Sequence, residues 1–270
     1  MQNSSKRKRT IMITAIILSC LLTAIFEFVS ISPFKQTIYN KLLQNILPLP
    51  FATLSVLLLA RTCGYKLFFR PQKLFCLLPC LLIAIDNFPF ASYFAGKLEL
   101  KYAQPLAFFG FAVYCLFVGL FEEILFRGIL FGVLTERFSK DKKGLLKSYM
   151  LSSLIFGLMH LLNLFTGASI GATLLQACYS ILTGGLFAYA FLKSKNILIP
   201  ALVHAVYNCC GLLFTAELGL GYGSLIDLPT ALTMLCVCSL VGCFVVYQVL
   251  TYPERERTEL YVRLGVSKKN

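Results

Sequence analysis

The chain has 270 residues, of which 58% are hydrophobic and only 14% are charged, and its mean hydropathy is +0.77. This composition lies far outside the range of soluble domains and excludes a soluble globular enzyme. The net charge of +13 does not indicate nucleic-acid binding, because lysine and arginine occupy the short segments between apolar runs and form no basic motif. We therefore expect a membrane protein without a nucleic-acid partner.

Apolar runs long enough to cross a bilayer recur along the whole chain. A transmembrane helix needs about 20 predominantly apolar residues, and the sequence predicts eight such helices. They fall near residues 11–31, 44–60, 74–95, 104–126, 148–165, 170–192, 196–214 and 228–250. No internal repeat or low-complexity linker divides the chain, so we expect an all-α, polytopic bundle that forms a single integral membrane domain over residues 1–270.

The basic residues predict the orientation of this bundle. They concentrate in alternate loops, as the positive-inside rule requires of cytoplasmic segments. These segments are 6–9, 61–73, 137–147, 193–195 and 255–269. Both termini are therefore expected in the cytoplasm. The first apolar run follows a basic segment, as in a signal peptide, but it continues past Cys20, and we expect an uncleaved anchor.

Acidic and basic side chains also occur inside the predicted spans, where each costs at least roughly 2.5–3.5 kcal/mol and requires an explanation. Residues 122–127 read EEILFR, two adjacent carboxylates followed by an arginine. Glu123 and Arg127 share a helix face at i,i+4 and can neutralise each other, whereas Glu122 points to another face. Glu122 therefore remains a free carboxylate, as a general base requires.

The only two histidines of the chain also lie in predicted spans. His160 ends the segment FGLMH, and His204 begins the segment HAVYN, which puts Asn208 one helical turn after it. An imidazole and an amide on one helix face can donate two hydrogen bonds to a single oxygen, as a developing oxyanion requires.

These polar groups are predicted at similar depths in the membrane. At 1.5 Å per helical residue, Glu123, His160 and His204 lie roughly 14 to 21 Å from the nearest basic loop on the predicted cytoplasmic side. Three separate helices therefore direct polar groups to one level. This agreement predicts a single polar cavity, reached from the cytoplasmic side.

The residues resemble the motifs of the CAAX protease and bacteriocin-processing (CPBP) family of intramembrane proteases, which includes CAAX prenyl endopeptidases and bacterial self-immunity proteins. The family carries EExxxR, FxxxH and HxxxN, each on its own helix and in this order. The matching residues here are Glu122-Glu123 to Arg127, Phe156 to His160, and His204 to Asn208. The resemblance covers about residues 104–214, which it marks as the catalytic core.

The resemblance implies hydrolysis of a peptide bond in a membrane-associated peptide, a prenylated protein or a leader peptide. It implies that Glu122 and His160 activate a water molecule, while His204 and Asn208 stabilise the oxyanion. The residues in a supporting role would be Glu123 and Arg127. A compact chain with little beyond the motif core favours a bacterial plasma membrane as its location.

A metal is the open question of this resemblance. Members of the family are commonly described as metalloproteases, and His160, His204 and Glu122 could supply the three protein ligands of a catalytic zinc. The chain has no His-Glu-x-x-His motif, however, and a glutamate–histidine pair can polarise water without a metal. We expect metal-free chemistry, with zinc as the alternative.

Two other functions are compatible with the same residues. A protein of this fold could act as a bacteriocin self-immunity factor that binds its target without proteolysis. Intramembrane glutamate, histidine and aspartate also form proton relays in transporters, although the sequence shows no inverted repeat of the kind typical of transporters. Outside the motifs, Glu27 and Asp86 with Asn87 are expected in packing or cavity positions, with a substrate path as the alternative.

Overall fold

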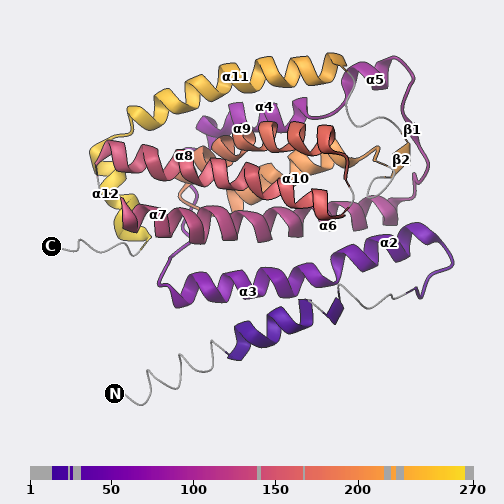
Figure 1. Cartoon of the computed structure of the whole chain (residues 1–270), viewed down its shortest axis with the longest axis horizontal. Helices are drawn as coiled ribbons and strands as arrows, with labels where there is room; N and C mark the ends of the chain where they lie inside the picture. The colour runs from indigo at the N-terminus through magenta and orange to yellow at the C-terminus, as the bar shows by residue number, and fades with distance from the viewer. Residues whose placement is uncertain are drawn as a thin grey trace.

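The computed structural model describes residues 14–23, 25–26, 32–138, 141–166, 168–215, 220–222 and 228–264. Most of these residues are helical, which confirms the predicted all-α fold (Figure 1). Strands β1 (Glu99–Leu100) and β2 (Gly221–Tyr222) add one short antiparallel pair. Glu27 lies outside the described residues, so its role stays a prediction.

The first part of the described chain consists of short helices. They are α2 (Thr37–Ile46), α3 (Pro48–Thr62), η1 (Leu74–Leu77), α4 (Leu78–Asp86) and α5 (Phe90–Phe94). Proline occupies the first turn of α3, α4 and also of α6, the next helix. At the start of α6, which follows the extended residue Gln104, the missing N–H is harmless, because the first turn of a helix has no intrahelical acceptor for it.

The second part contains the longer helices and all three motifs. Its elements are α6 (Pro105–Glu123), η2 (Ile124–Leu130), α7 (Phe131–Arg137), α8 (Lys142–Met159), η3 (His160–Thr166), α9 (Ile170–Ser194), α10 (Leu198–Leu212), α11 (Leu228–Leu250) and α12 (Glu254–Arg263). Side-chain caps start two of them. Asp141 accepts a hydrogen bond from the Gly144 N–H at α8, and Ser169 accepts one from the Ala172 N–H at α9.

Helix α10 lies in the middle of the bundle and packs against α6, α4 and α9. Helix α8 packs along α9, and α11 lies across both of them, at the top of the view in Figure 1. Helices α2 and α3 cover the outside of α6, at the bottom of the same view. Of the three motif-bearing helices, α10 thus contacts α6 directly, and α9 joins α8 to α10.

Four helices in the described part of the chain are long and apolar enough to cross a membrane: Thr37–Thr62, Pro105–Arg137, Lys142–Phe165 and Ile170–Ser194. A fifth is counted if Leu235–Leu250 and Glu254–Val262, which meet at an angle of 86°, form one span. The apolar helices Thr14–Thr23, Leu74–Asp86 and Leu198–Leu212 are shorter. The protein is therefore a polytopic integral membrane protein, and the predicted count of eight spans is not confirmed.

Two motif-bearing helices differ in length from their predicted ranges. The helix predicted over 104–126 continues to Arg137, because η2 and α7 prolong α6 without a break. The helix predicted over 148–165 already begins at Lys142 and changes to 3-10 turns at His160. Hydropathy finds the apolar part of a helix and not its polar extension, which explains the early start of α8 in the lysine-rich residues 142–147. The other helix is predicted to end just before Arg127, but the apolar residues 128–134 continue it beyond this charge.

Glycine allows close contact between the helices that carry the motifs. A methyl group at Gly119 on α6 would lie 2.6 Å from the carbonyl oxygen of Ala201 on α10. A methyl group at Gly157 on α8 would lie 2.7 Å from the carbonyl oxygen of Ala177 on α9. Small residues of this kind let membrane helices approach backbone to backbone, and they hold α6 against α10 and α8 against α9.

Candidate active site

The two adjacent glutamates end α6, and the backbone after them is π-helical over Ile124–Leu130. π-helical turns are rare in proteins, and those that occur often lie at functional sites. Here the π-helical turn carries Arg127. This side chain has no exposed surface, and neither has Glu123.

Arg127 forms a buried ion pair with Glu123, as the i,i+4 spacing predicts. Its Nη1 lies 2.7 Å from Oε1 of Glu123, and its Nη2 donates a 2.8 Å hydrogen bond to the carbonyl oxygen of Gly184 on α9. The guanidinium carbon also lies 4.3 Å from the centre of the Phe156 ring, in cation–π contact. These contacts tie α6, α8 and α9 together around one charge pair.

His204 lies between the two glutamates. Its Nδ1 is 2.9 Å from Oε1 of Glu123, and its Nε2 is 3.7 Å from Oε2 of Glu122. A carboxylate only accepts hydrogen bonds, so Nδ1 carries the hydrogen that it donates to Glu123. The imidazole ring stacks on Phe187 of α9 at 4.4 Å, with 17° between the planes. Both the position and the orientation of His204 are thereby fixed.

His160 lies at the junction of α8 and η3, where the helix changes to 3-10 turns. Its Nδ1 is 3.1 Å from the carbonyl oxygen of Phe156. The Phe156 ring contacts both histidines, with ring centres 5.3 Å from His160 and 5.9 Å from His204. Phe156 is therefore more than a packing residue, because it lies between the two imidazoles and against Arg127.

The structure brings most of the predicted site residues together by direct contact. Glu122 and Glu123 each contact His204, Arg127 pairs with Glu123, and the Phe156 ring contacts both His204 and His160. In the described part of the chain, no hydrogen bond or ion pair joins Glu122 to His160. Asn208 is half-buried one turn after His204 on α10, and no hydrogen bond among the described residues occupies its amide. The catalytic roles of these residues stay predictions.

The three residues considered as zinc ligands do not form a metal site. Among the residues that the structure describes, no group of three or more His, Cys, Asp and Glu side chains could hold a metal ion. The nearest contact within the set is the 3.7 Å between Glu122 and His204, and His160 bonds to a backbone carbonyl. The donors as they lie do not fit a catalytic zinc.

Two site residues on α9 have no counterpart in the motifs. Gly184 supplies a carbonyl oxygen to Arg127, and Phe187 supplies the surface on which His204 stacks. A methyl group at Gly184 would lie 2.9 Å from Cδ1 of Phe156. The sequence holds one signal for this place, since the pair Gly184-Gly185 in an apolar run is typical of close helix contacts.

Asn87, which the motifs do not include, has a packing position near the site. Its Nδ2 donates a 2.8 Å hydrogen bond to the carbonyl oxygen of Tyr207, and so joins the end of α4 to α10. Tyr207 itself is buried, with its ring centre 5.9 Å from that of Phe187. Both residues help to set the position of α10 behind His204.

Comparison with known families agrees with the motifs. Residues 104–210 match the family model for Rce1-like type II CAAX prenyl endopeptidases, and this range contains every motif residue. The match is consistent with the CPBP family and confirms the resemblance. The matched family is a protease family, which supports an enzymatic function. No curated protein and no solved structure matched the chain.

Proposed function

We propose that the protein is an intramembrane endopeptidase that hydrolyses a peptide bond in a membrane-associated, prenylated or leader-peptide substrate. One observation carries the proposal. Two carboxylates of α6 converge on His204 of α10 inside an apolar bundle, within the range that matches a protease family. Charged and polar groups that meet at such a place indicate function, because they are costly to keep there.

Glu122 is the general base in this proposal. Its side chain is 25% exposed, whereas that of Glu123 has no exposed surface. Glu122 therefore keeps accessible surface for a water molecule or a substrate, which Glu123 lacks. Glu122 takes a proton from a water molecule that His160 helps to orient, and the water oxygen forms a bond to the scissile carbonyl carbon.

His204 and Asn208 stabilise the oxyanion that forms on the carbonyl oxygen. Nδ1 of His204 donates to the Glu123 carboxylate 2.9 Å away, and this bond fixes the imidazole. When Nε2 also carries a hydrogen, it donates that hydrogen to the oxyanion. The Asn208 amide on the same helix face supplies the second hydrogen bond.

The intermediate then collapses as the proton held by Glu122 passes to the leaving nitrogen. The carbon–nitrogen bond breaks, Glu122 is again ionised, and the products are a carboxylic acid and an amine, which become a carboxylate and an ammonium group when a proton passes from the acid to the amine through water. Arg127 and Glu123 take no part in the proton transfer and hold His204 in place. Every step uses side chains of this chain and water alone.

We further propose that residues 104–214 form the catalytic core of a single membrane domain that spans residues 1–270. Both termini would lie in the cytoplasm of a bacterial cell. The basic segments between apolar helices support this orientation, including 137–147 and 193–195.

Cleavage in water enriched in oxygen-18 tests the proposed function. The purified protein in lipid vesicles is incubated with a panel of membrane-anchored, prenylated and leader peptides, and the products are analysed by mass spectrometry. We expect products with one heavy oxygen in the new carboxyl group for the wild type and none for Glu122→Gln. A self-immunity factor that acts by binding would cleave no peptide, and its protection of cells would survive Glu122→Gln.

A further inference from the structure

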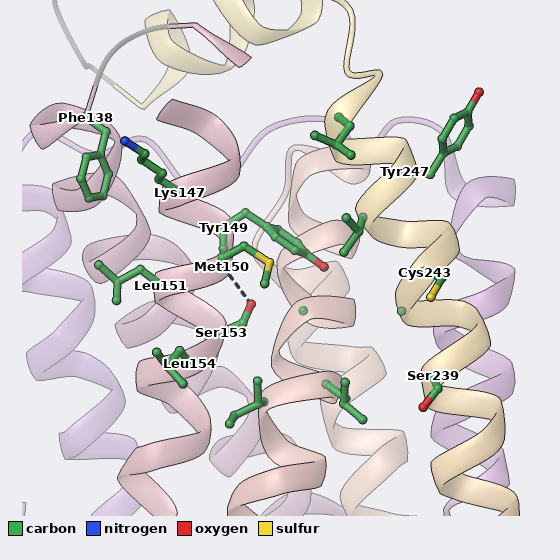
Figure 2. A pocket seen from close by; sticks show the side chains of 16 residues that line it. Phe138, Lys147, Tyr149, Met150, Leu151, Ser153, Leu154, Ser239, Cys243 and Tyr247 are labelled. Atoms are coloured by element: carbon green, nitrogen blue, oxygen red, sulfur yellow. Dashed lines mark hydrogen bonds between the residues drawn. The ribbon is translucent and has the colours of Figure 1, made fainter. Parts of the chain in front are cut away.

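A long groove lies between α8, α9 and α11, apart from the residues of the proposed chemistry. Its volume is about 890 Å³. Apolar side chains from all three helices line it, among them Leu154, Ile181 and Val246. Figure 2 shows Lys147 and Tyr247 toward one end and Ser239 toward the other. A groove of this composition suits a hydrocarbon chain.

The length of the groove matches one leaflet of a bilayer. Along α11 its lining residues run from Ser239 to Leu250, a rise of about 16 Å at 1.5 Å per residue. The hydrocarbon core of a membrane is roughly 30 Å thick, so this rise is about half of it. Leu250 ends α11, and the chain then turns by 86° into the charge-rich helix α12. We place the membrane surface at this turn, because a charge-rich helix favours the interface over the hydrocarbon core.

The same end of the groove is positively charged. Lys147 lines it and is exposed, with its Nζ 6.0 Å from the centre of the Phe138 ring. None of the ion pairs among the described residues involves Lys147. Lys142 and Lys143 lie exposed in the first turn of the same helix. A phosphate at the membrane surface would complement this charge.

We propose that this groove is a binding site for an anionic phospholipid. The phosphate lies at Lys147, and one acyl chain fills the groove down to the level of Ser239. The lining includes Gly185, the neighbour of Gly184, whose carbonyl oxygen accepts a hydrogen bond from Arg127. The bound lipid thus packs against the part of α9 that supports the buried ion pair.

Native mass spectrometry of the purified full-length protein tests the charged end. The probes are phosphatidylglycerol and phosphatidylcholine with identical acyl chains. We expect the wild type to retain phosphatidylglycerol preferentially, and Lys147→Gln to weaken its binding about fivefold, the size expected of one lysine near an anionic surface. Lys97→Gln is the control, because Lys97 is an exposed lysine that does not line the groove; it should leave the preference intact.

A second pair of variants tests the apolar part. A methyl group at Gly242, which lines the groove, meets no atom within 4 Å, so Gly242→Phe can place its ring in the groove. Gly171 is equally open but lies outside the groove, and Gly171→Phe is the control. We expect Gly242→Phe to lose both lipids and Gly171→Phe to retain them.

Several results would overturn the proposal. One is equal binding of both lipids by the wild type, with no effect of Lys147→Gln. Another is unchanged binding of phosphatidylglycerol by Gly242→Phe. A third is displacement of the lipid by a farnesylated peptide whose own binding is unchanged by Lys147→Gln. The groove would then bind the lipid anchor of a substrate instead of a phospholipid. Should Gly242→Phe fail to fold, Lys147→Gln still decides, since this exposed side chain makes no ion pair among the described residues.

Discussion

Nδ1 of His204 lies 2.9 Å from Oε1 of Glu123, although 81 positions separate the two residues in the chain. The same carboxylate oxygen is 2.7 Å from Arg127. The position of the histidine therefore depends on a fully buried ion pair. The preceding residue, Glu122, keeps 25% of its side chain exposed. Two adjacent glutamates thus have different environments, one fully enclosed and paired with Arg127, the other with accessible surface.

Arg127→Ala should destabilise the fold strongly. It would leave the Glu123 carboxylate buried without its partner, and breaking a buried pair in this way costs about 3–5 kcal/mol of the free energy of unfolding. Unfolding in detergent followed by helical circular dichroism measures the change. Arg137→Ala is the control, since Arg137 is exposed at the end of α7 and should alter stability by no more than about 0.5 kcal/mol. Equal stability of the two variants would refute the structural role of the pair.

Gly119→Ala should reduce both stability and activity. The added methyl group would lie 2.6 Å from the Ala201 carbonyl oxygen, so α10 must move away from α6 and take His204 away from the glutamates. Gly171→Ala, at an open position on α9, should be neutral or slightly stabilising, because alanine favours a helix more than glycine does. Thermal unfolding and cleavage rates of the two variants check the prediction, which fails if both behave alike.

Much of the fold could be predicted because it depends on local properties. Hydropathy and the spacing of charges are enough to predict an all-α membrane protein. Helix periodicity is enough to predict the contact between Glu123 and Arg127. The sequence also predicts in outline that the motif residues converge, because polar side chains in a membrane are stabilised by contact with one another. The number of spans could not be predicted from hydropathy, because several apolar runs form helices that are shorter than a bilayer is thick.

The details of the site depend on tertiary packing and could not be predicted. The motifs suggest a partnership of Glu122 with His160, whereas the contact in the structure joins Glu122 to His204. This choice depends on how closely α6 and α10 approach at Gly119. The motifs also leave out Gly184 and Phe187: the pair Gly184-Gly185 indicates a close helix contact but not the hydrogen bond to Arg127, and a stacking ring leaves no specific pattern.

Asn208→Ala should lower kcat and leave stability unchanged. Loss of one oxyanion donor typically costs about 10²- to 10³-fold in kcat. No hydrogen bond among the described residues uses this amide, so its removal breaks none of the hydrogen bonds in that part of the chain. Asn45→Ala on α2 serves as the control. A large fall in the unfolding temperature of Asn208→Ala, or full retention of kcat, would contradict the assigned role.

Chelation should leave cleavage unaffected. His160, His204 and Glu122 form no metal-binding group in the structure, and the proposed steps use carboxylate and imidazole groups alone. The cleavage rate is measured before and after incubation with 1,10-phenanthroline and dialysis. Reversible loss of activity that added zinc restores would show that the donors rearrange around a metal.

The most direct measurement compares Glu122→Gln with Glu123→Gln in cleavage rate and in unfolding temperature. The account predicts that Glu122→Gln abolishes cleavage while the unfolding temperature stays at the wild-type value, because the side chain is partly exposed and makes no short hydrogen bond to any residue that the structure describes. Glu123→Gln should lower both, because its carboxylate supports Arg127 and His204. A Glu122→Gln variant that still cleaves peptides would contradict the central claim that Glu122 is the general base.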